Sequence, residues 1–472
     1  MEWSLVSVEL LVCGWIVVIL IADLLLPAAR KPSLWALALT GVVLAAILLI
    51  GTSAAWSGQT FQEMFVADRF AGYFKGLFLL TTAIVILMTR EFLAQVTEHL
   101  GAFYMLLFTA LLGMLVLASI NDLLMLFIGL ELLTFPLYIM AAYLKTDARS
   151  VEAGMKYLIL GSVSSGFLVY GTALLYGFAG STGFPAIRAA LTAGPAPLTA
   201  QAGLLCLIAG LGFKVAAVPF NFWVPDVYEG APTPVVALLS VGSKMAGVVA
   251  IFQVLYGVFF PLQHFWGGLL ASLSAATMLY GNLAAIPQTN IKRLLGYSSI
   301  GHSGYLLMGL STASSAGMEG VSYYLLAYLV STLAVFFVVV TASNAIGGDA
   351  LDNYTGLSTR SPLLAAVMFV GLLSLAGVPP LAGFVGKLLV LLAAAESRHL
   401  WLVAIGAVNV AIALYYYLLV VKRMYLGVPA TPAPIRVGLL TRTALLGLVV
   451  SIVVIGVFQE PFLRQIIRAI QP

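Results

Sequence analysis

Long apolar runs separated by short polar stretches recur along the whole chain. Fourteen of these runs are long enough to be membrane-spanning helices, at about 20 apolar residues each. Their approximate bounds are 5–26, 33–52, 70–89, 100–118, 122–143, 157–178, 202–224, 233–257, 266–286, 293–312, 320–346, 362–393, 400–421 and 439–458. The pattern predicts an all-α integral membrane protein with about 14 transmembrane helices.

Prolines interrupt two of the runs at membrane depth. Pro219 and Pro225 fall in or beside the seventh run, and Pro379 and Pro380 fall in the twelfth. A proline inside a helix removes a backbone donor and leaves a carbonyl unpaired, so a helix is expected to break there. The pattern therefore predicts broken helices at spans 7 and 12.

The two breaks share a short sequence pattern. Alanine, valine and proline recur in the same relative places, at Ala216, Val218 and Pro219 and again at Ala376, Val378 and Pro379. The offset of 160 residues corresponds to about five spans, and an odd number of spans inverts the second copy. The sequence thus predicts an N-terminal three-span segment (1–99), two inverted five-helix repeats (100–257 and 266–425) and a C-terminal span (436–472).

Composition fits a membrane protein and leaves no room for a soluble catalytic domain. Of the 472 residues, 62% are hydrophobic and 8% are charged, whereas soluble domains have about 25% charged residues. The net charge of +4 does not indicate a nucleic-acid partner, because in a membrane protein its meaning depends on the loops that carry it. If the chain starts outside, thirteen of the 22 basic residues lie on the cytoplasmic side and six on the other. The positive-inside rule then predicts that both termini lie outside.

The candidate ionisable residues at membrane depth, each on a separate predicted span, are Glu131, Lys214, Lys244, His302 and Lys387. A charge at membrane depth costs several kcal/mol, so each of these residues is a candidate functional group. The simpler alternative is that a lysine extends its side chain to the membrane surface or pairs structurally, and that the histidine only completes a hydrogen bond. Lys214 and Lys244 lie too far from the span ends for their side chains to extend to the membrane surface.

The residue types in this set favour proton transfer over metal binding. Burial weakens a lysine's hold on its proton, and a nearby carboxylate strengthens it. A change in the Glu131–Lys214 distance would therefore switch whether the Lys214 amine holds a proton. A hard metal cation would need several carboxylate or carbonyl oxygens, and a charged lysine cannot ligate it. Hydroxyl residues that could hold water between the charges, although most are expected to pack helices, are Ser162, Ser164, Ser165, Thr172, Ser240, Ser243, Tyr297, Ser298, Ser299 and Ser303.

Three further charged residues have simpler interpretations. Lys75 lies near a predicted span end, where its amine is expected to reach the membrane surface. Glu152 and Lys156 lie four residues apart at the start of the sixth span. A solvated helical ion pair is the favoured interpretation of these two, and a proton entrance is the alternative.

The sequence offers no motif for a metal or redox centre. Cys13 and Cys206 lie in apolar runs, and the four histidines are far apart in sequence. It also contains no glycine-rich dinucleotide fingerprint and no phosphate-binding loop. Any flavin, haem, iron–sulfur or ATP chemistry is therefore expected in another chain.

Three segments of the chain carry distinctive motifs. The first segment comprises 213–220 (FKVAAVPF) and 225–235 (PDVYEGAPTPV), the second is 292–302 (KRLLGYSSIGH), and the third is 378–387 (VPPLAGFVGK). With these motifs the chain resembles the antiporter-like membrane subunits of respiratory complex I, and the similarity covers nearly the whole chain. One departure is Asn221, where members of the family often have histidine, which leaves a water or proton role at that position in doubt.

The resemblance implies fourteen helices with two inverted five-helix repeats, in the inner membrane of a bacterium. It implies proton translocation coupled to quinone reduction in other subunits, which would carry NADH, flavin and iron–sulfur clusters. By motif match, the family's span-five glutamate is Glu131, and its lysines of spans seven, eight and twelve are Lys214, Lys244 and Lys387. The partners implied are other membrane and peripheral subunits, the lipid bilayer, protons and water.

Two other functions remain open. A subunit of a multi-subunit cation/proton antiporter would share the fold and many of these motifs, although Lys387 and the run 226–232 favour the complex I subunits. A non-catalytic membrane scaffold is the second alternative. It predicts that apolar replacements of the buried charges leave proton pumping intact.

Overall fold

The computed structural model describes residues 3–52, 58–96, 99–429 and 433–470. Within these ranges the chain is almost entirely helical, and its one sheet is a hairpin of β1 (Gly58–Thr60) and β2 (Phe65–Ala67), paired antiparallel. The remaining elements of the N-terminal segment are η1 (Trp3–Val6), α1 (Ser7–Leu25), η2 (Ala28–Ser33), α2 (Leu34–Thr52) and α3 (Arg69–Val96).

The part of the chain predicted as the first repeat folds into a second group of helices. They are α4 (Leu100–Leu117), α5 (Leu123–Ala141), α6 (Ala148–Ala179), α7 (Phe184–Thr192), α8 (Leu198–Lys214), α9 (Trp223–Gly230), α10 (Thr233–Leu238), η4 (Leu239–Ser243), α11 (Lys244–Phe252) and η5 (Gln253–Val258).

A third group completes the bundle. It comprises η6 (Phe260–Leu262), α12 (Gln263–Ala285), α13 (Ile291–Ser311), α14 (Ser315–Ile346), η7 (Leu351–Tyr354), α15 (Leu357–Arg360), α16 (Pro362–Ala376), α17 (Ala382–Glu396), α18 (Leu400–Leu426), α19 (Leu439–Val457) and α20 (Gln459–Ile470).

Side-chain caps mark where several of these helices begin. An oxygen of the residue before each helix accepts backbone N–H groups of the first turn, which would otherwise lack a partner. These cap residues are Asp122 before α5, Asp147 before α6, Asn290 before α13 and Ser314 before α14. The sequence thus starts these helices with its own polar side chains.

Eleven helical segments of the described residues are long and apolar enough to cross a membrane. The predicted spans 202–224, 293–312 and 362–393 are not among them. The first and third are divided by breaks, which leaves α8 with 17 residues and α16 with 15. The predicted all-α membrane fold is confirmed, whereas the count of fourteen and the inverted repeat stay predictions.

Both predicted helix breaks are present. The first separates α8, which ends at Lys214, from α9, and Ala216 within it has a positive φ of 61°. The second separates α16 from α17, and Gly377 takes the left-handed conformation there with φ 90°. Each break leaves the last carbonyl groups of a half-helix without helical partners, next to a candidate lysine.

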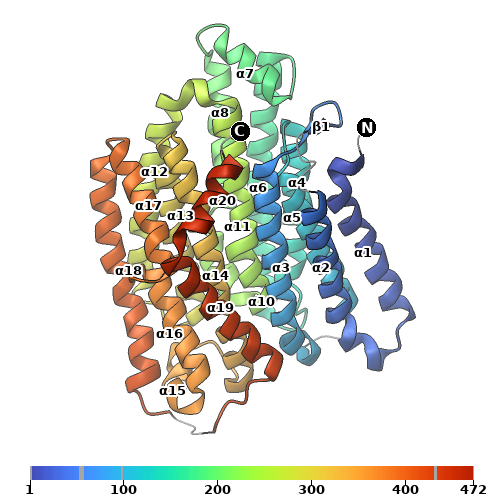
Figure 1. Cartoon of the computed structure of the whole chain (residues 1–472), viewed down its shortest axis with the longest axis vertical. Coiled ribbons are helices and arrows are strands. Elements are labelled where there is room, and N and C mark those ends of the chain that lie inside the picture. Colours follow the sequence, from blue (N-terminus) through green and yellow to red (C-terminus); the bar gives the residue numbers. More distant parts are fainter. Residues whose placement is uncertain (1–2, 53–57, 97–98, 430–432, 471–472) are drawn as a thin grey trace.

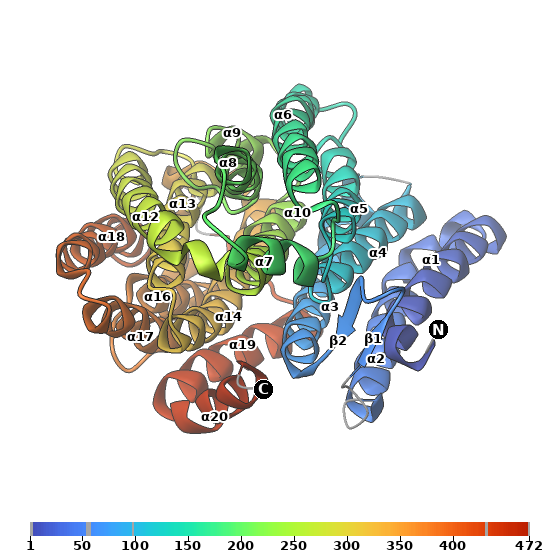
Figure 2. The same ribbon diagram turned by 90° about the horizontal axis from the view of Figure 1, so that it is seen from above.

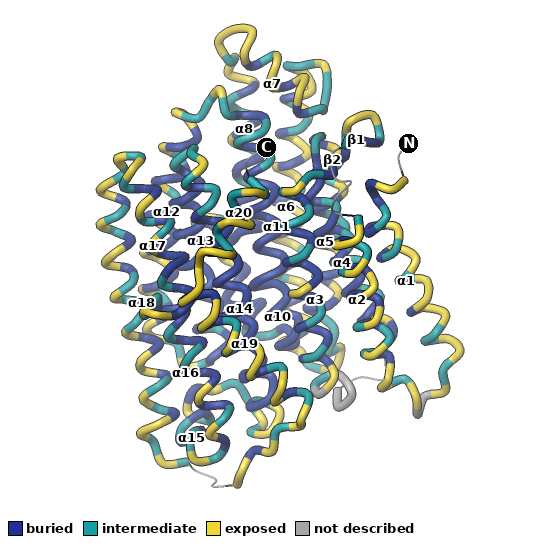
Figure 3. The backbone as a smooth tube through the Cα atoms, viewed as in Figure 1, coloured by how far each residue is buried: buried dark blue, intermediate teal, exposed yellow. Residues whose placement is uncertain are grey.

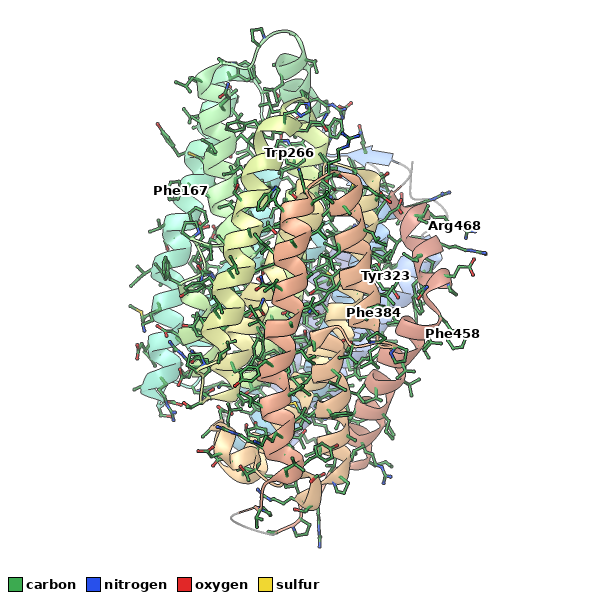
Figure 4. All side chains as sticks on the ribbon, turned by 90° about the vertical axis from the view of Figure 1, so that its left-hand side faces the viewer. Phe167, Trp266, Tyr323, Phe384, Phe458 and Arg468 are labelled. Atoms are coloured by element: carbon green, nitrogen blue, oxygen red, sulfur yellow. The ribbon has the colours of Figure 1, made fainter. Side chains whose placement is uncertain are left out.

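The core of the bundle lies along α10, α11, α13 and α14, which are buried over most of their length (Figure 3). Seen from above, α1 and α2 lie on one side and α18 on the other, with α10 and α14 between them (Figure 2). Apolar side chains such as Phe167 on α6 and Phe458 after α19 project outward (Figure 4). Such an apolar surface suits contact with lipid or with other membrane subunits.

The N and C labels both lie towards the end of the bundle that carries α7, and α15 lies at the opposite end (Figure 1). We call these the α7 end and the α15 end. Both ends of the chain therefore lie towards the same side of the bundle.

Lys75 does not extend to the membrane surface, so the prediction for this residue is wrong. Its side chain is 0% exposed, and its Nζ lies 2.7 Å from Glu9 Oε1 and 4.8 Å from the centre of the Phe65 ring. The reason is that α1 supplies a carboxylate beside α3, and burying both charges together costs less than burying one alone.

Candidate functional site

The five predicted site residues come from five helices of the bundle. Glu131 is on α5, Lys214 at the end of α8, Lys244 at the start of α11, His302 on α13 and Lys387 on α17. The three lysines and the histidine are at most 4% exposed. The structure thus places four of the five in the interior, where an ionisable group needs polar partners.

Glu131 and Lys214 are near each other but make no direct ion pair, even though both residues are described. Lys214 Nζ donates to Thr134 Oγ1 at 2.7 Å, one turn along α5 from Glu131. The Glu131 carboxylate accepts from Ser165 Oγ on α6 at 2.5 Å. Hydroxyl groups therefore hold both charges in this arrangement.

The Glu131 carboxylate also borders the outside of the bundle. It lines a groove of about 480 Å³ with Thr109 of α4 and with Phe127 and Phe135 of α5. The other lining residues are apolar. A side chain or water from outside this chain would therefore reach Glu131 more readily than it would reach Lys214.

Lys387 lies beside the second helix break. Its Nζ donates to the carbonyl oxygen of Ala376, the last residue of α16, at 3.0 Å. The amine also lies 4.9 Å from the centre of the Tyr305 ring. Because the carboxyl end of a helix carries partial negative charge, the break supplies the amine with a favourable acceptor without a carboxylate.

Lys244 is bound through Ser299 of α13. Its Nζ donates to the Ser299 carbonyl oxygen at 2.5 Å and also to the Ser299 hydroxyl. That hydroxyl is 3.2 Å from Tyr228 Oη and 3.1 Å from Tyr328 Oη. Ser299 thus connects the lysine of α11 to two buried tyrosines.

His302 lies between two tyrosines, one turn along α13 from Ser299. Its Nδ1 is 2.5 Å from Tyr324 Oη of α14, and its Nε2 is 3.1 Å from Tyr417 Oη of α18. The Tyr324 ring packs 6.2 Å, centre to centre, from that of Tyr305, which contacts Lys387. Polar and aromatic contacts therefore lead from Lys244 past His302 towards Lys387.

Four tyrosines of this site were not singled out from the sequence: Tyr228, Tyr324, Tyr328 and Tyr417. Each is buried, and each hydroxyl meets a serine or His302. Tyrosines are common in membrane helices, so the useful signal would have been their position inside runs that also carry buried charges.

The hydroxyl residues predicted to hold water divide into two groups. Ser165, Ser240, Ser298 and Ser299 contact a candidate site residue or one of the four tyrosines. Ser162, in contrast, is exposed and donates to the Leu158 carbonyl of its own helix. Asn221, at which the sequence left a water or proton role in doubt, is 1% exposed and lies in the first break.

A charged cluster lies at the α15 end of α6, α9 and α13. Lys156 binds Glu152 at 2.7 Å and Asp226 at 2.6 Å, and Arg293 binds Asp226 at 2.7 Å and Glu229 at 3.0 Å. The predicted Glu152–Lys156 pair exists but belongs to this wider network. Burial alone would raise the pKa of Asp226, yet the hydrogen bonds from Lys156 and Arg293 lower it below its ordinary value.

A metal site has no support among the described residues, in which no three His, Cys, Asp or Glu side chains gather to hold an ion. Cys13 and Cys206 are both free thiols. The chemistry of the site is thus that of amines, hydroxyls, one carboxylate and one imidazole.

Broken helices beside buried lysines define the class of protein as an antiporter-like helical membrane protein. Residues 120–413 match the family described as "NADH:quinone oxidoreductase/Mrp antiporter, TM". The chain belongs to this family, in the branch of the NADH-quinone oxidoreductase N subunits.

The relatives that place it there match nearly full length. The subunit N of Desulforamulus reducens is 39% identical over 98% of this chain and 96% of its own. A chain of respiratory complex I from Thermus thermophilus with bound aureothin superposes with a TM-score of 0.81 at 31% identity, over 97% of this chain and 98% of that one. A chain of the Mrp complex from Dietzia, with a TM-score of 0.88 at 20% identity over 100% and 97%, shows the shared fold alone.

Proposed function

We propose that this chain is the proton-translocating membrane subunit of an NADH:quinone oxidoreductase in a bacterial inner membrane. Protons pass through Glu131, Lys214, Lys244, His302 and Lys387, driven by quinone reduction in other subunits. The observation that carries the proposal is the series of buried amines, hydroxyls and tyrosines across α5, α8, α11, α13 and α17.

The chemistry of this series suits protons better than metal cations. Each lysine amine meets a hydroxyl or carbonyl oxygen, and each can bind or release one proton. A sodium-like ion would need several oxygen ligands at one place, whereas the described path has one carboxylate, on α5.

The redox chemistry belongs to partner subunits in this proposal. NADH, flavin, iron–sulfur clusters and quinone would bind there, and this chain would bind none of them. The relatives named NADH-quinone oxidoreductase subunit N support this division of labour.

The orientation and the repeat organisation are part of the same proposal. Both termini lie on the outer side, so that the α15 end faces the cytoplasm. The two inverted repeats are residues 100–257 and 266–425, and the flanking segments are 1–99 and 436–472. The proposal includes three membrane crossings in addition to the eleven long apolar segments, which makes fourteen. The two helix breaks, each beside a lysine, support the pairing of the repeats.

The test is proton pumping by the assembled complex in vesicles, with NADH oxidation measured in parallel. Glu131→Gln, Lys214→Ala and Lys387→Ala should each lower pumping at least several-fold, because each removes a titrating group. Normal pumping in all three variants would contradict the proposal and favour a non-catalytic membrane scaffold. Copurification without flavin and iron–sulfur subunits, together with sodium-dependent proton exchange, would favour the cation/proton antiporter.

A further inference from the structure

A second set of buried polar residues lies beside His302, between α12 and α18. These two helices are neighbours on the side of the bundle opposite α1 (Figures 1 and 2). The set consists of Asn282 on α12 and of Asn409 and Tyr416 on α18, each at most 2% exposed. None of the three contacts the ionisable residues of the proposed path directly.

The backbone fixes which way the two amides point. Asn282 Nδ2 lies 3.0 Å from the Met278 carbonyl oxygen, and Asn409 Nδ2 lies 2.9 Å from that of Ile405. A carbonyl oxygen only accepts, so each amide nitrogen must face it. The side-chain oxygens of Asn282 and Asn409 are therefore left to accept from other groups.

These orientations determine the remaining hydrogen bonds. Asn282 Nδ2 donates its second hydrogen to Asn409 Oδ1 at 3.0 Å. Asn282 Oδ1 accepts from Tyr416 Oη at 3.0 Å, so the Tyr416 hydroxyl is the donor. Asn282 thus uses both amide hydrogens and its oxygen, and it holds α18 at two points.

The two points on α18 are seven residues apart, which is two helical turns on the same face. One attachment would let α18 rotate or slide, whereas two at this spacing fix both its rotation and its height against α12. Tyr417, the next residue after Tyr416, is the one whose hydroxyl lies 3.1 Å from His302 Nε2. The position of that hydroxyl therefore depends on the attachment of α18 through Asn282, together with its own hydrogen bond to Ser298 Oγ of α13.

The position of α12 against α13 is also constrained. A Cβ added to Gly281 would lie 2.3 Å from the backbone nitrogen of Gly301, so α12 and α13 touch backbone to backbone there. Asn282 and His302 directly follow these glycines. Asn282 is consequently fixed relative to His302, and through it α18 is fixed as well.

We infer that Asn282, Asn409 and Tyr416 are positioning residues that set the Tyr417 hydroxyl on His302 Nε2. The inference rests on the proposed proton path through His302. A proton crosses the imidazole when one nitrogen gains a proton and the other releases one, so both tyrosine contacts are needed together. Without the attachment, α18 shifts and the Nε2 contact opens, while the Tyr324 contact on α14 remains.

The experiment measures proton pumping, NADH oxidation and their pH profiles in vesicles containing the assembled complex. Asn282→Leu should lower pumping at least fivefold and move its pH profile. Asn409→Asp should stay within twofold of the unchanged chain, because a protonated carboxyl accepts from Asn282 and donates to the Ile405 carbonyl. Asn409→Leu lacks both contacts and should resemble Asn282→Leu.

Tyr416→Phe keeps the ring packed 4.5 Å from that of Tyr417 and loses only one attachment, so an intermediate loss of pumping is expected. This variant carries the test if Asn282→Leu fails to assemble. The matched control is Tyr323→Phe, which removes a buried hydroxyl that donates to the Ile455 carbonyl away from His302. Pumping within twofold of the unchanged chain and an unmoved pH profile in both Asn282→Leu and Tyr416→Phe would overturn the inference. Lys387→Ala is measured alongside: normal pumping in that variant would count against the proposed function instead.

Discussion

The buried lysines of the proposed path are held by neutral oxygens rather than by carboxylates. Lys214 meets Thr134, Lys244 meets Ser299, and Lys387 meets the Ala376 carbonyl. The lysines could be predicted from the sequence because a charge inside an apolar run is rare. Their partners could not, since Thr134 lies 80 residues from Lys214 and no local pattern connects them.

Thr134→Val tests whether the Lys214 contact matters for pumping. The change keeps the side-chain shape and removes the hydroxyl that accepts from Nζ, which leaves a buried amine without that partner at a cost of about 1–3 kcal/mol. Pumping by the assembled complex should fall several-fold. Thr341→Val is the control, because its buried hydroxyl donates only to the Phe337 carbonyl of its own helix. Equal pumping in the two variants would remove Thr134 from the path.

At the scale of elements, the prolines predicted the two helix breaks correctly, because an interior proline removes a backbone hydrogen bond wherever it occurs. The charged cluster of α6, α9 and α13 was predicted only as the local pair of Glu152 and Lys156. Its other members are Asp226 and Glu229 of α9 and Arg293 of α13. Asp226 and Arg293 are 67 residues apart and meet only in the folded bundle. Lys75 was misjudged for the same reason, as its carboxylate partner is on another helix.

The joint between α16 and α17 should tolerate no side chain at Gly383. A Cβ there would lie 1.8 Å from the Ser374 carbonyl oxygen, so the two half-helices would have to separate. Gly383→Ala should therefore destabilise the subunit by about 1–3 kcal/mol and lower the amount of assembled complex. Gly447→Ala on α19, where nothing lies within 4 Å, is the control. Normal assembly of Gly383→Ala would show that the joint is looser than described.

Asp226→Asn should weaken the charged cluster in a pH-dependent way. Because the folded pKa of Asp226 is lowered, its carboxylate stabilises the fold above its unfolded pKa of about 3.9, and that stability is lost as the pH falls. The partly exposed position limits the effect to about 1 kcal/mol. Thermal unfolding in detergent should show a lower Tm for the variant at pH 7, with the difference shrinking as the pH falls below about 4. A difference that grows towards acid pH would contradict this sign.

At the scale of the whole molecule, hydropathy predicted a bundle of membrane helices because lipid requires every backbone group to be paired within a helix. It could not rank the helices by burial. The segment from Thr233 to Val258 and that from Ser315 to Ile346 are as apolar as the lipid-facing helices, yet they form the centre. Only packing between distant segments distinguishes them, and the same packing brings His302 and Tyr417 together.

The proposed orientation predicts which side of the membrane exposes the loop between α5 and α6. Lys145 in that loop is exposed, so Lys145→Cys should react with an impermeant thiol reagent only from the cytoplasmic side. The background should lack Cys13 and Cys206, since Cys13 is exposed on α1. Labelling from the outer side would reverse the orientation of the whole bundle.

The most direct test compares two Glu–Lys sets of the helical bundle in the assembled complex. Glu131→Gln with Lys214→Met removes both charges from the proposed path and leaves no unpaired charge behind. Glu9→Gln with Lys75→Met does the same to the buried pair of α1 and α3, outside the path. Protons pumped per NADH oxidised are measured for both in vesicles.

If protons pass through Glu131 and Lys214, the variant of these two residues assembles and loses most of its pumping, while the α1–α3 variant pumps within twofold of the unchanged chain. Equal pumping by the two variants, whether retained or lost, would contradict a proton path through Glu131 and Lys214.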